Sequence, residues 1–341
     1  MGVSVVIPAF NAARLIGAAI ASAQAQSQPP DEIIVIDDCS TDDTGGVVRE
    51  MMASDDRIAL LRTPRNSGPG AARNLGLTRA GGDWIALLDA DDAFDRDRLE
   101  QLTGLAGAAG VDMVSDNILC CAGDVSEPVP MYRPDELPTK PFILSTARFV
   151  DGCVGDRRRP RQSLGFMQPL MARSFLRHHR LRYVEGARFG EDFLLYLACL
   201  AAGARWLVTP QPMYRYTIRS GSLTERQSPA DLWRVRTAIQ AMLDDPTLVP
   251  GSPLARSGRR CRTRIDHNYF YRAFTDAVKS GAGYEALRVL FSSFASPGHV
   301  VQASFEQMPT ILRKAMAGGY VSPRQKSRTA ARTPAGDAAA S

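Results

Sequence analysis

Three aspartates stand within four positions in the segment WIALLDADDAF. Residues 84–88 are mostly apolar, and Asp89, Asp91 and Asp92 follow directly. A short apolar run of this kind predicts a strand that is buried on both faces. Three carboxylates at the end of such a strand repel one another, so solvent or a cation must compensate their charge. Two interpretations follow: a cation-binding loop, or a solvated turn in which Asp92 or Asp95 caps the next helix.

Polar residues also follow two other predicted strands. Residues 3–7 lead into Pro8, Phe10 and Asn11, and the strand Glu32–Asp37 leads into Asp38. In open α/β sheets, ligands bind beyond the carboxyl ends of parallel strands. These segments can therefore share one crevice with the acidic loop, and this convergence is the main sequence evidence for a site.

Strands and helices alternate through the first third of the chain. The apolar patterns predict strands at residues 3–7, 32–37, 57–62, 84–88 and 111–114, and helices near 15–23, 71–79 and 98–108. Another helix is predicted through Val47, Val48 and Met51, with Ser40 and Thr41 as its caps. Such repeated strand–helix units with short connections predict an α/β fold with a mostly parallel, Rossmann-like sheet flanked by helices.

The second half of the chain has a less regular pattern of predicted strands and helices than the first. Residues 116–165 are less regular, residues 189–202 predict a helix, and residues 205–208 and 212–218 predict strands. That helix begins with Glu191 and Asp192, which are either chemically active or a simple complement to the helix dipole. Helical patterns cover residues 229–245 and 256–295, and the composition after Gly318 predicts a disordered tail.

The bulk properties exclude some classes of protein. The net charge of +5 is mild, so it allows an anionic substrate or membrane surface without requiring one. We find no nucleic-acid-binding motif. The six cysteines form no CxxC pair, which suits buried, reduced thiols. Because no signal peptide or bilayer-length apolar run is present, we expect a cytoplasmic protein whose contact with a membrane would be peripheral.

A nucleotide-sugar matches the chemistry of these residues. Its diphosphate needs a divalent cation, Mg²⁺ or Mn²⁺, for which Asp91 and Asp89 supply carboxylates. Asp38 and Phe10 offer a hydrogen-bond acceptor and an apolar face to the base. Arg73 either approaches phosphate or forms a surface ion pair. Asp192 is the best candidate to activate an acceptor hydroxyl. A dinucleotide-binding GxGxxG motif and a P-loop are both absent.

Five motifs in order carry a family resemblance. VVIPAFNAARLI, IVIDDCSTDDT, RNSGPGAARNLGL, GDWIALLDADD and FGEDFLLYLA resemble those of the inverting family 2 glycosyltransferases with the GT-A nucleotide-diphospho-sugar transferase fold. The resemblance covers about residues 3–220. DDCSTD, NSGPGAARN and DMVSDN are most similar to the glucosyltransferases that extend succinoglycan-type exopolysaccharides.

The resemblance implies a role for each matching residue. Phe10 would stack on uracil, Asp38 would bind its N3 position, and Asp89 would contact ribose or a metal-bound water. Asp91 would hold Mg²⁺ or Mn²⁺, and Asp192 would be the catalytic base, supported by Glu191. The other nucleotide-sugar contacts it implies are Pro8, Asn11, Arg73 and Ala90. Arg215 or Arg219 would cover the diphosphate.

It also implies an organisation and a reaction. Residues 1–220 would form the GT-A domain, with a nucleotide-binding half (1–115) and an acceptor-binding half (116–220). Residues 221–318 would form a helical C-terminal extension and 319–341 a tail. The enzyme would transfer a sugar, expected to be glucose, from a UDP-sugar to a glycan or lipid-linked oligosaccharide. Basic residues 157–161 and 324–332 would touch the inner membrane face. The alternative is a catalytically inactive nucleotide-sugar-binding subunit.

Overall fold

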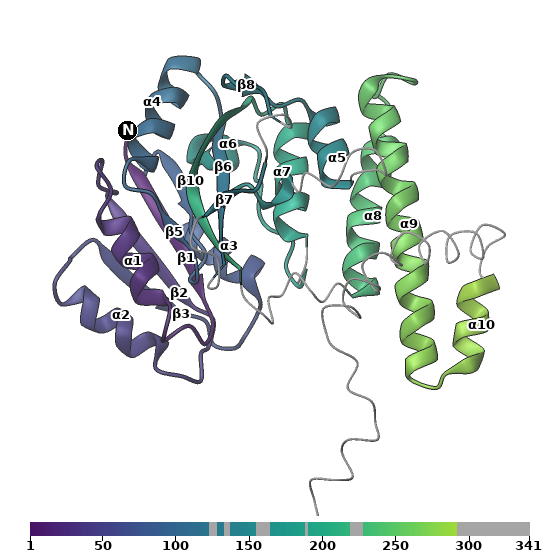
Figure 1. The fold of residues 1–341 in the computed structure, drawn as a ribbon, viewed down its shortest axis with the longest axis horizontal. Helices are drawn as coiled ribbons and strands as arrows, with labels where there is room; N and C mark the ends of the chain where they lie inside the picture. Colours follow the sequence, from purple (N-terminus) through teal and green to yellow (C-terminus); the bar gives the residue numbers. More distant parts are fainter. Residues whose placement is uncertain (123–127, 133–136, 155–163, 188–189, 219–227, 292–341) are drawn as a thin grey trace, which may run out of the picture. The chain divides into compact units, whose positions relative to one another are not determined.

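The computed structural model describes residues 1–122, 128–132, 137–154, 164–187, 190–218 and 228–291 (Figure 1). The chain divides into two compact units, Met1–Tyr269 and Phe270–Ser341. The first unit contains the sheet and all the residues of the candidate site. The described part of the second unit consists of the last residues of helix α9 (Pro253–Lys279) and helix α10 (Gly283–Phe291).

One mixed sheet organises the first unit. Its strand order is β3-β2-β1-β4-β9-β6-β10-β5, with β7 paired to β6 and β8 paired to β10. The first four strands in this order are mutually parallel, and β10 is parallel to β6. β9 lies antiparallel between β4 and β6, and β5 is antiparallel to β10. The predicted α/β fold is confirmed, and its antiparallel pairs involve β5, β7, β8 and β9.

The first half follows the predicted alternation. Its elements are β1 (Val3–Ala9), α1 (Ile16–Gln24), β2 (Glu32–Asp37), α2 (Thr44–Met52), β3 (Ile58–Arg62), α3 (Pro69–Arg79), β4 (Trp84–Leu87), β5 (Ala93–Phe94) and α4 (Arg98–Ala109). The predicted caps are wrong. Asp43 precedes α2 and Asp97 precedes α4, and neither makes a side-chain capping bond. Ser40, Thr41, Asp92 and Asp95 instead bond to other segments.

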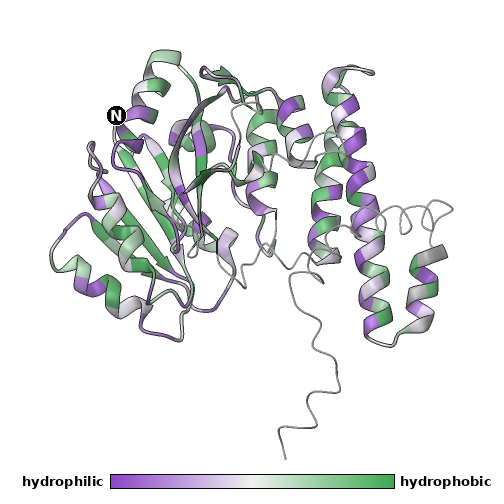
Figure 2. Ribbon diagram, viewed as in Figure 1, coloured by the Kyte–Doolittle hydropathy of each residue, from purple (hydrophilic) through white to green (hydrophobic). Residues whose placement is uncertain are grey.

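Side chains on alternate positions of the strands enter two separate cores. Val6, Ile34 and Ile36 belong to the core that also holds helices α3, α5 (Thr146–Val154) and α7 (Glu191–Ala201). Val5 and Val35 point to the opposite core, under α1, α2 and α4. This period of two is the pleat of a sheet that is covered on both faces. The strands of the first half are accordingly almost uniformly hydrophobic in Figure 2.

The second half contains one long strand where two were predicted. β10 (Trp206–Ile218) pairs with β6 (Met113–Ala122), and its register shifts on both sides of Pro212. Proline lacks the N–H that a regular ladder needs, so a bulge keeps the strand continuous. The short elements β7 (Val129–Pro130), β8 (Phe142–Ile143), η1 (Leu164–Phe166), β9 (Leu170–Ala172) and α6 (Arg173–His178) were not predicted.

Two further helices belong to the first unit, in whole or in part. α8 (Pro229–Leu243) begins with a capping box between Ser228 and Asp231. Leu232, Val235 and Ile239 of α8 share a core with α7, as do Cys261 and Ile265 of α9. A helical pattern was predicted for residues 256–295, and the structure has two helices there. The chain breaks between α9 and α10 at Gly281, which has a φ of 72°. Among the described residues, no helix is long and apolar enough to cross a membrane.

Candidate active site

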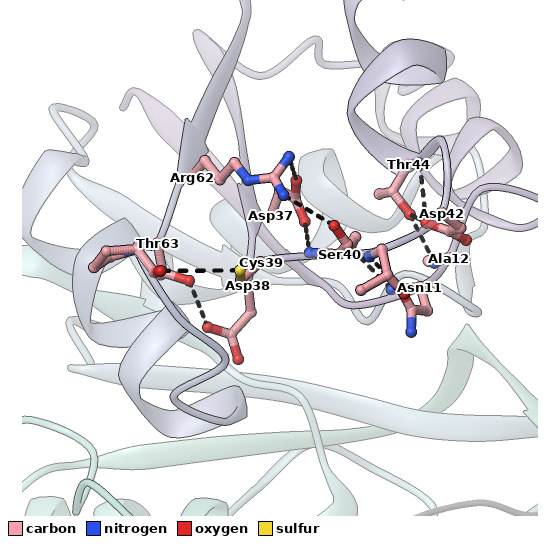
Figure 3. A network of polar contacts seen from close by, with 12 residues as sticks. Asn11, Ala12, Asp37, Asp38, Cys39, Ser40, Asp42, Thr44, Arg62 and Thr63 are labelled. Carbon is pink, nitrogen blue, oxygen red and sulfur yellow. Dashed lines mark hydrogen bonds and ion pairs between the residues drawn. The ribbon is translucent and has the colours of Figure 1, made fainter.

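The loops after β1 and β2 are bonded to each other at the carboxyl edge of the sheet (Figure 3). The backbone N–H of Asn11 donates to Ser40 Oγ at 2.9 Å, and its side-chain Oδ1 accepts from the N–H of Thr41 at 2.8 Å. Asn11 adopts a φ of +51°, which asparagine tolerates better than most residues. These bonds fix the turn that presents Phe10, whose side chain is 49% exposed. Pro8 lies in β1 beside this turn.

The buried carboxylate of Asp38 holds the glycine-rich loop in place. It accepts hydrogen bonds from the N–H of Ser67 at 3.0 Å, the N–H of Gly68 at 2.8 Å and the hydroxyl of Thr63 at 2.7 Å. Gly68 has a φ of +87° immediately before α3, a conformation that favours glycine. The expected contact of Asp38 with a base stays a prediction. The structure adds that this carboxylate sets the path of the chain into α3.

The three aspartates after β4 differ in their surroundings. Asp92 is buried, and it accepts hydrogen bonds from the hydroxyl of Tyr214 and the N–H of Thr217, both at 2.8 Å. Burial, together with the charge of Asp89, raises the pKa of Asp92 to about 8. Asp89 and Asp91 are only half-buried, and Ala90 between them is buried. Asp92 therefore anchors the loop to β10, whereas the other two carboxylates are partly exposed at the edge of the sheet.

Arg73 joins the acidic loop to helix α7. Its Nη2 lies 2.7 Å from Asp89 Oδ1, and its Nη1 lies 2.9 Å from Glu191 Oε1 and 3.5 Å from Asp192 Oδ1. The guanidinium is almost fully buried, and although burial alone would lower its pKa, the carboxylates around it hold that pKa well above the ordinary value. Of the two interpretations of Arg73, the ion pair is present, but it is not at the surface, because the guanidinium is buried.

Asp192 stands on the first turn of α7, with 15% of its side chain exposed. Burial raises its pKa to about 7, against the opposing effect of Arg73 and with smaller contributions from the charges of Glu191 and Asp89. A carboxylate with this proton affinity can accept a proton near neutral pH. Gly190 precedes the pair with a φ of +76°, so the helix starts abruptly at Glu191.

Four site residues were missed by the sequence analysis. Asn74 bonds the main chain of Tyr183 twice, donating to its carbonyl at 2.9 Å and accepting from its N–H at 2.8 Å. The Arg73 guanidinium lies 5.4 Å from the centre of the Tyr183 ring. Tyr196 follows Asp192 by one helical turn, a spacing that could have identified it. Tyr183 and Tyr214 carry no such signal, because only the fold brings them to the site.

Other predicted features lie elsewhere. Arg215 is ion-paired with Asp95. Arg219 and the basic segments 157–161 and 324–332 fall outside the described residues. Cys199 and Cys261 are buried as expected, whereas Cys39, Cys120 and Cys121 are only half-buried. A cavity of about 830 Å³ lies between α4 and β10 and is lined in part by Tyr132, Pro138 and Pro212, but by none of the predicted site residues.

Within the described ranges, no group of three or more acidic, histidine or cysteine side chains could hold a metal ion. Mg²⁺, however, is usually held by only one or two protein carboxylates together with substrate phosphates and water. Asp91 and Asp89, half-buried at a strand end, match this smaller donor set. The residues therefore fit a cation that arrives with a diphosphate, and they do not fit one held by protein ligands alone.

The fold is that of the GT-A glycosyltransferases. The chain superposes on the crystal structure of S. aureus TarS 1-349 in complex with UDP-GlcNAc with a TM-score of 0.62, covering 89% of this chain and 79% of that one. At 18% identity, this likeness establishes the fold alone.

The sequence comparisons then establish the family. Residues 4–165 match the model of glycosyl transferase family 2. The chain is 36% identical over 283 residues to the succinoglycan biosynthesis protein ExoU of Rhizobium meliloti (strain 1021). The aligned region covers 83% of this chain and 80% of ExoU. It is 39% identical over 222 residues to ExoO of the same organism, covering 65% of this chain and 62% of ExoO, less than two thirds of that protein. The chain belongs to glycosyl transferase family 2, and the predicted family is confirmed.

Proposed function

We propose that this protein is an inverting hexosyltransferase that moves glucose from a UDP-sugar to a growing exopolysaccharide or other cell-surface glycan. The names of ExoU and ExoO support succinoglycan-type polysaccharide as the product class. The UDP-GlcNAc complex of TarS supports a UDP-sugar donor. In this proposal the acceptor is lipid-linked, and the protein reaches it at the cytoplasmic membrane face through peripheral contacts.

The observation that carries the proposal is the joining of two distant segments by one arginine. Arg73 holds Asp89 of the acidic loop and the Glu191–Asp192 pair of α7 within 3.5 Å of its guanidinium nitrogens. A glycosyl transfer needs a donor site and a proton acceptor next to each other. The loop supplies the first and α7 supplies the second.

On the donor side, each residue has a separate task. Phe10 offers an exposed ring against the uracil, and Asp38 recognises its N3 position while fixing the glycine-rich loop. Pro8 and Asn11 shape the adjoining turn. Asp91, together with Asp89, would hold Mg²⁺ or Mn²⁺, which when bound would neutralise charge on the diphosphate leaving group.

On the acceptor side, Asp192 takes the proton of the acceptor hydroxyl. The acceptor oxygen then forms a bond to the anomeric carbon, and the bond from that carbon to the diphosphate oxygen breaks. The electron pair of the broken bond leaves with UDP, and the anomeric configuration inverts. Because burial raises the pKa of Asp192 to about 7, the carboxyl is poised to accept this proton near neutral pH.

A transfer screen with UDP-, GDP- and TDP-sugars tests the proposal. We expect product only with UDP-sugars, and UDP-glucose to be the best donor. Asp192→Asn removes the basicity at constant size, so transfer should fall by at least about 100-fold while donor affinity is retained. Donor binding without any transfer by the wild type would instead identify a catalytically inactive, nucleotide-sugar-binding subunit.

A further inference from the structure

Four buried polar atoms around the candidate base have no hydrogen-bond partner among the described residues. They are Asp192 Oδ1, Tyr183 Oη, Tyr196 Oη and Arg73 Nε. Buried hydroxyls are normally paired, and an unpaired one is unfavourable compared with the ring of phenylalanine. Two such hydroxyls beside one carboxylate are therefore not explained by the packing of the core.

Three elements bring these groups together. Asp192 and Tyr196 lie one turn apart on α7, so their side chains share a face. Tyr183 is held by two main-chain hydrogen bonds with the Asn74 side chain of α3, one donated and one accepted by Asn74. Arg73, the neighbour of Asn74, lies against the Tyr183 ring and 3.5 Å from Asp192 Oδ1. The main-chain bonds of Tyr183 fix its ring without using its hydroxyl.

The charges around Asp192 show how the hydroxyls act on it. Arg73 faces it from α3, Asp89 from the acidic loop, Glu191 from α7, and Tyr183 from the segment before α7. Burial, followed by the charge of Asp192, raises the pKa of Tyr183 and Tyr196, so both hydroxyls stay protonated. Although no hydrogen bond of normal geometry joins them, the Tyr183 hydroxyl lies close enough to Asp192 to lower its pKa, opposing burial, and Tyr183 lowers the pKa of Tyr196 in the same way.

We infer that Tyr183 and Tyr196 are positioning residues: the Tyr183 hydroxyl holds the inner oxygen of Asp192, and the Tyr196 hydroxyl supports that of Tyr183, so that the outer oxygen of Asp192 faces the acceptor hydroxyl. The inner oxygen, Oδ1, is buried, while the Asp192 side chain as a whole keeps 15% exposure. Arg73 cannot do this alone, because its two terminal nitrogens also bind Asp89 and Glu191 more closely. The inference rests on the proposed function of Asp192.

Tyr183→Phe and Tyr196→Phe test the inference in the full-length protein, because each removes one hydroxyl and keeps the ring. For Tyr183→Phe we expect kcat to fall about 10- to 100-fold, with the donor dissociation constant unchanged. The acid limb of its pH–rate profile should move to higher pH, because the carboxylate loses a stabilising donor. Tyr196→Phe should lower kcat less. Tyr132→Phe, at a buried tyrosine whose main chain bonds Asn117, is the matched control and should change neither quantity.

The melting temperature separates positioning from packing. Each phenylalanine variant keeps the buried ring and its packing, so we expect a melting temperature close to that of the wild type. A loss of kcat without a lower melting temperature cannot come from unfolding. In an Asp192→Asn background, Tyr183→Phe should have no further effect on kcat. A Tyr183→Phe enzyme with wild-type kcat and pH profile would overturn the inference and leave the proposed function intact. A wild type that transfers no sugar would overturn both.

Discussion

The raised pKa of Asp192 gives the enzyme a specific pH dependence. With a pKa of about 7, the carboxyl is mostly protonated at pH 6 and mostly ionised at pH 8. Since only the ionised form accepts a proton, kcat should rise roughly tenfold over this interval. Measuring kcat from pH 5.5 to 8.5 at saturating donor checks this. A flat profile would show that Asp192 is not the base.

The same shift predicts an opposite trend in stability. Folding raises the pKa of the Asp192 carboxyl from about 3.9 to about 7. A carboxyl whose pKa is higher in the folded state stabilises that state at low pH. This contribution is complete below pH 4 and is lost as the pH rises through 7. The melting temperature of the wild type should therefore fall relative to that of Asp192→Asn between pH 5 and 8. The pKa of Asp92 is also raised, but Asp92 is present in both proteins. The difference between their melting temperatures therefore reports the contribution of Asp192 alone.

Asp91 allows a direct test of the metal. Asp91→Asn removes one charge at constant size, so Mn²⁺-dependent binding of UDP should weaken and transfer should be nearly abolished. Titrating UDP by calorimetry, with and without Mn²⁺, measures the effect apart from catalysis. In the wild type, EDTA should produce the same loss of affinity. If the variant kept wild-type turnover in EDTA, the assignment of Asp91 as a metal ligand would be wrong.

At the scale of elements, α3 reaches the site because it packs closely on the sheet. A Cβ atom added to Gly76 would lie 2.3 Å from Val6 Cγ1 and 2.9 Å from Ile36 Cδ1. Gly76→Ala should therefore destabilise the fold by about 1–3 kcal/mol and displace Arg73 from the carboxylates. The melting temperature and kcat of this variant should both be lower than those of the wild type.

Gly104→Ala is the matched control for that variant. Gly104 is also helical, in α4, but a Cβ there would meet nothing within 4 Å. This alanine should stabilise the protein by about 0.4–1 kcal/mol, because it restricts the unfolded chain. Equal melting temperatures for the two variants would show that the contact of α3 with β1 and β2 is not tight in solution.

The elements that the sequence predicted well are those with long apolar patterns. β1, β2 and β4 are continuous apolar runs, and α1 has a clear helical face. β5 and β9 were missed because two or three residues carry no periodicity. Their pairing depends on β10, β4 and β6, which lie far away in the chain.

The candidate site shows the same limit. The motifs brought Asp89, Asp192 and Arg73 into one hypothesis, and the structure places all three together. The motifs assigned Asp89 and Asp91 to a ligand and gave Asp92 only a possible helix cap. They did not show that Asp92 anchors the loop, because that role depends on Tyr214 and Thr217, more than a hundred positions away. Long-range hydrogen bonds leave no local pattern, so the anchoring carboxylate of an acidic cluster cannot be identified from the sequence.

At the scale of the whole molecule, the predicted boundary at residue 220 remains a proposal that the packing of α7 makes testable. α8 approaches the start of α7: a Cβ on Gly190, directly before Glu191 and Asp192, would lie 3.1 Å from Val235 Cγ2. Leu232, Ile239 and Ile265 are buried in the same core. Burying side chains of this size contributes about 1.5–3 kcal/mol each.

A chain that ends at residue 220 should therefore melt well below the wild type and lose transfer, because α7 loses its cover beside Asp192. A chain that ends at Lys279 keeps α8 and α9 entire and is the matched control, so it should retain the fold of the first unit and its donor affinity. Melting curves and UDP binding of the two chains decide the matter. If the shorter chain folds and transfers sugar like the longer one, residues 1–220 are an autonomous domain and the helices after it serve another purpose. If only the longer chain does so, α8 and α9 are part of the catalytic domain, because without them the helix that carries the base cannot hold its place.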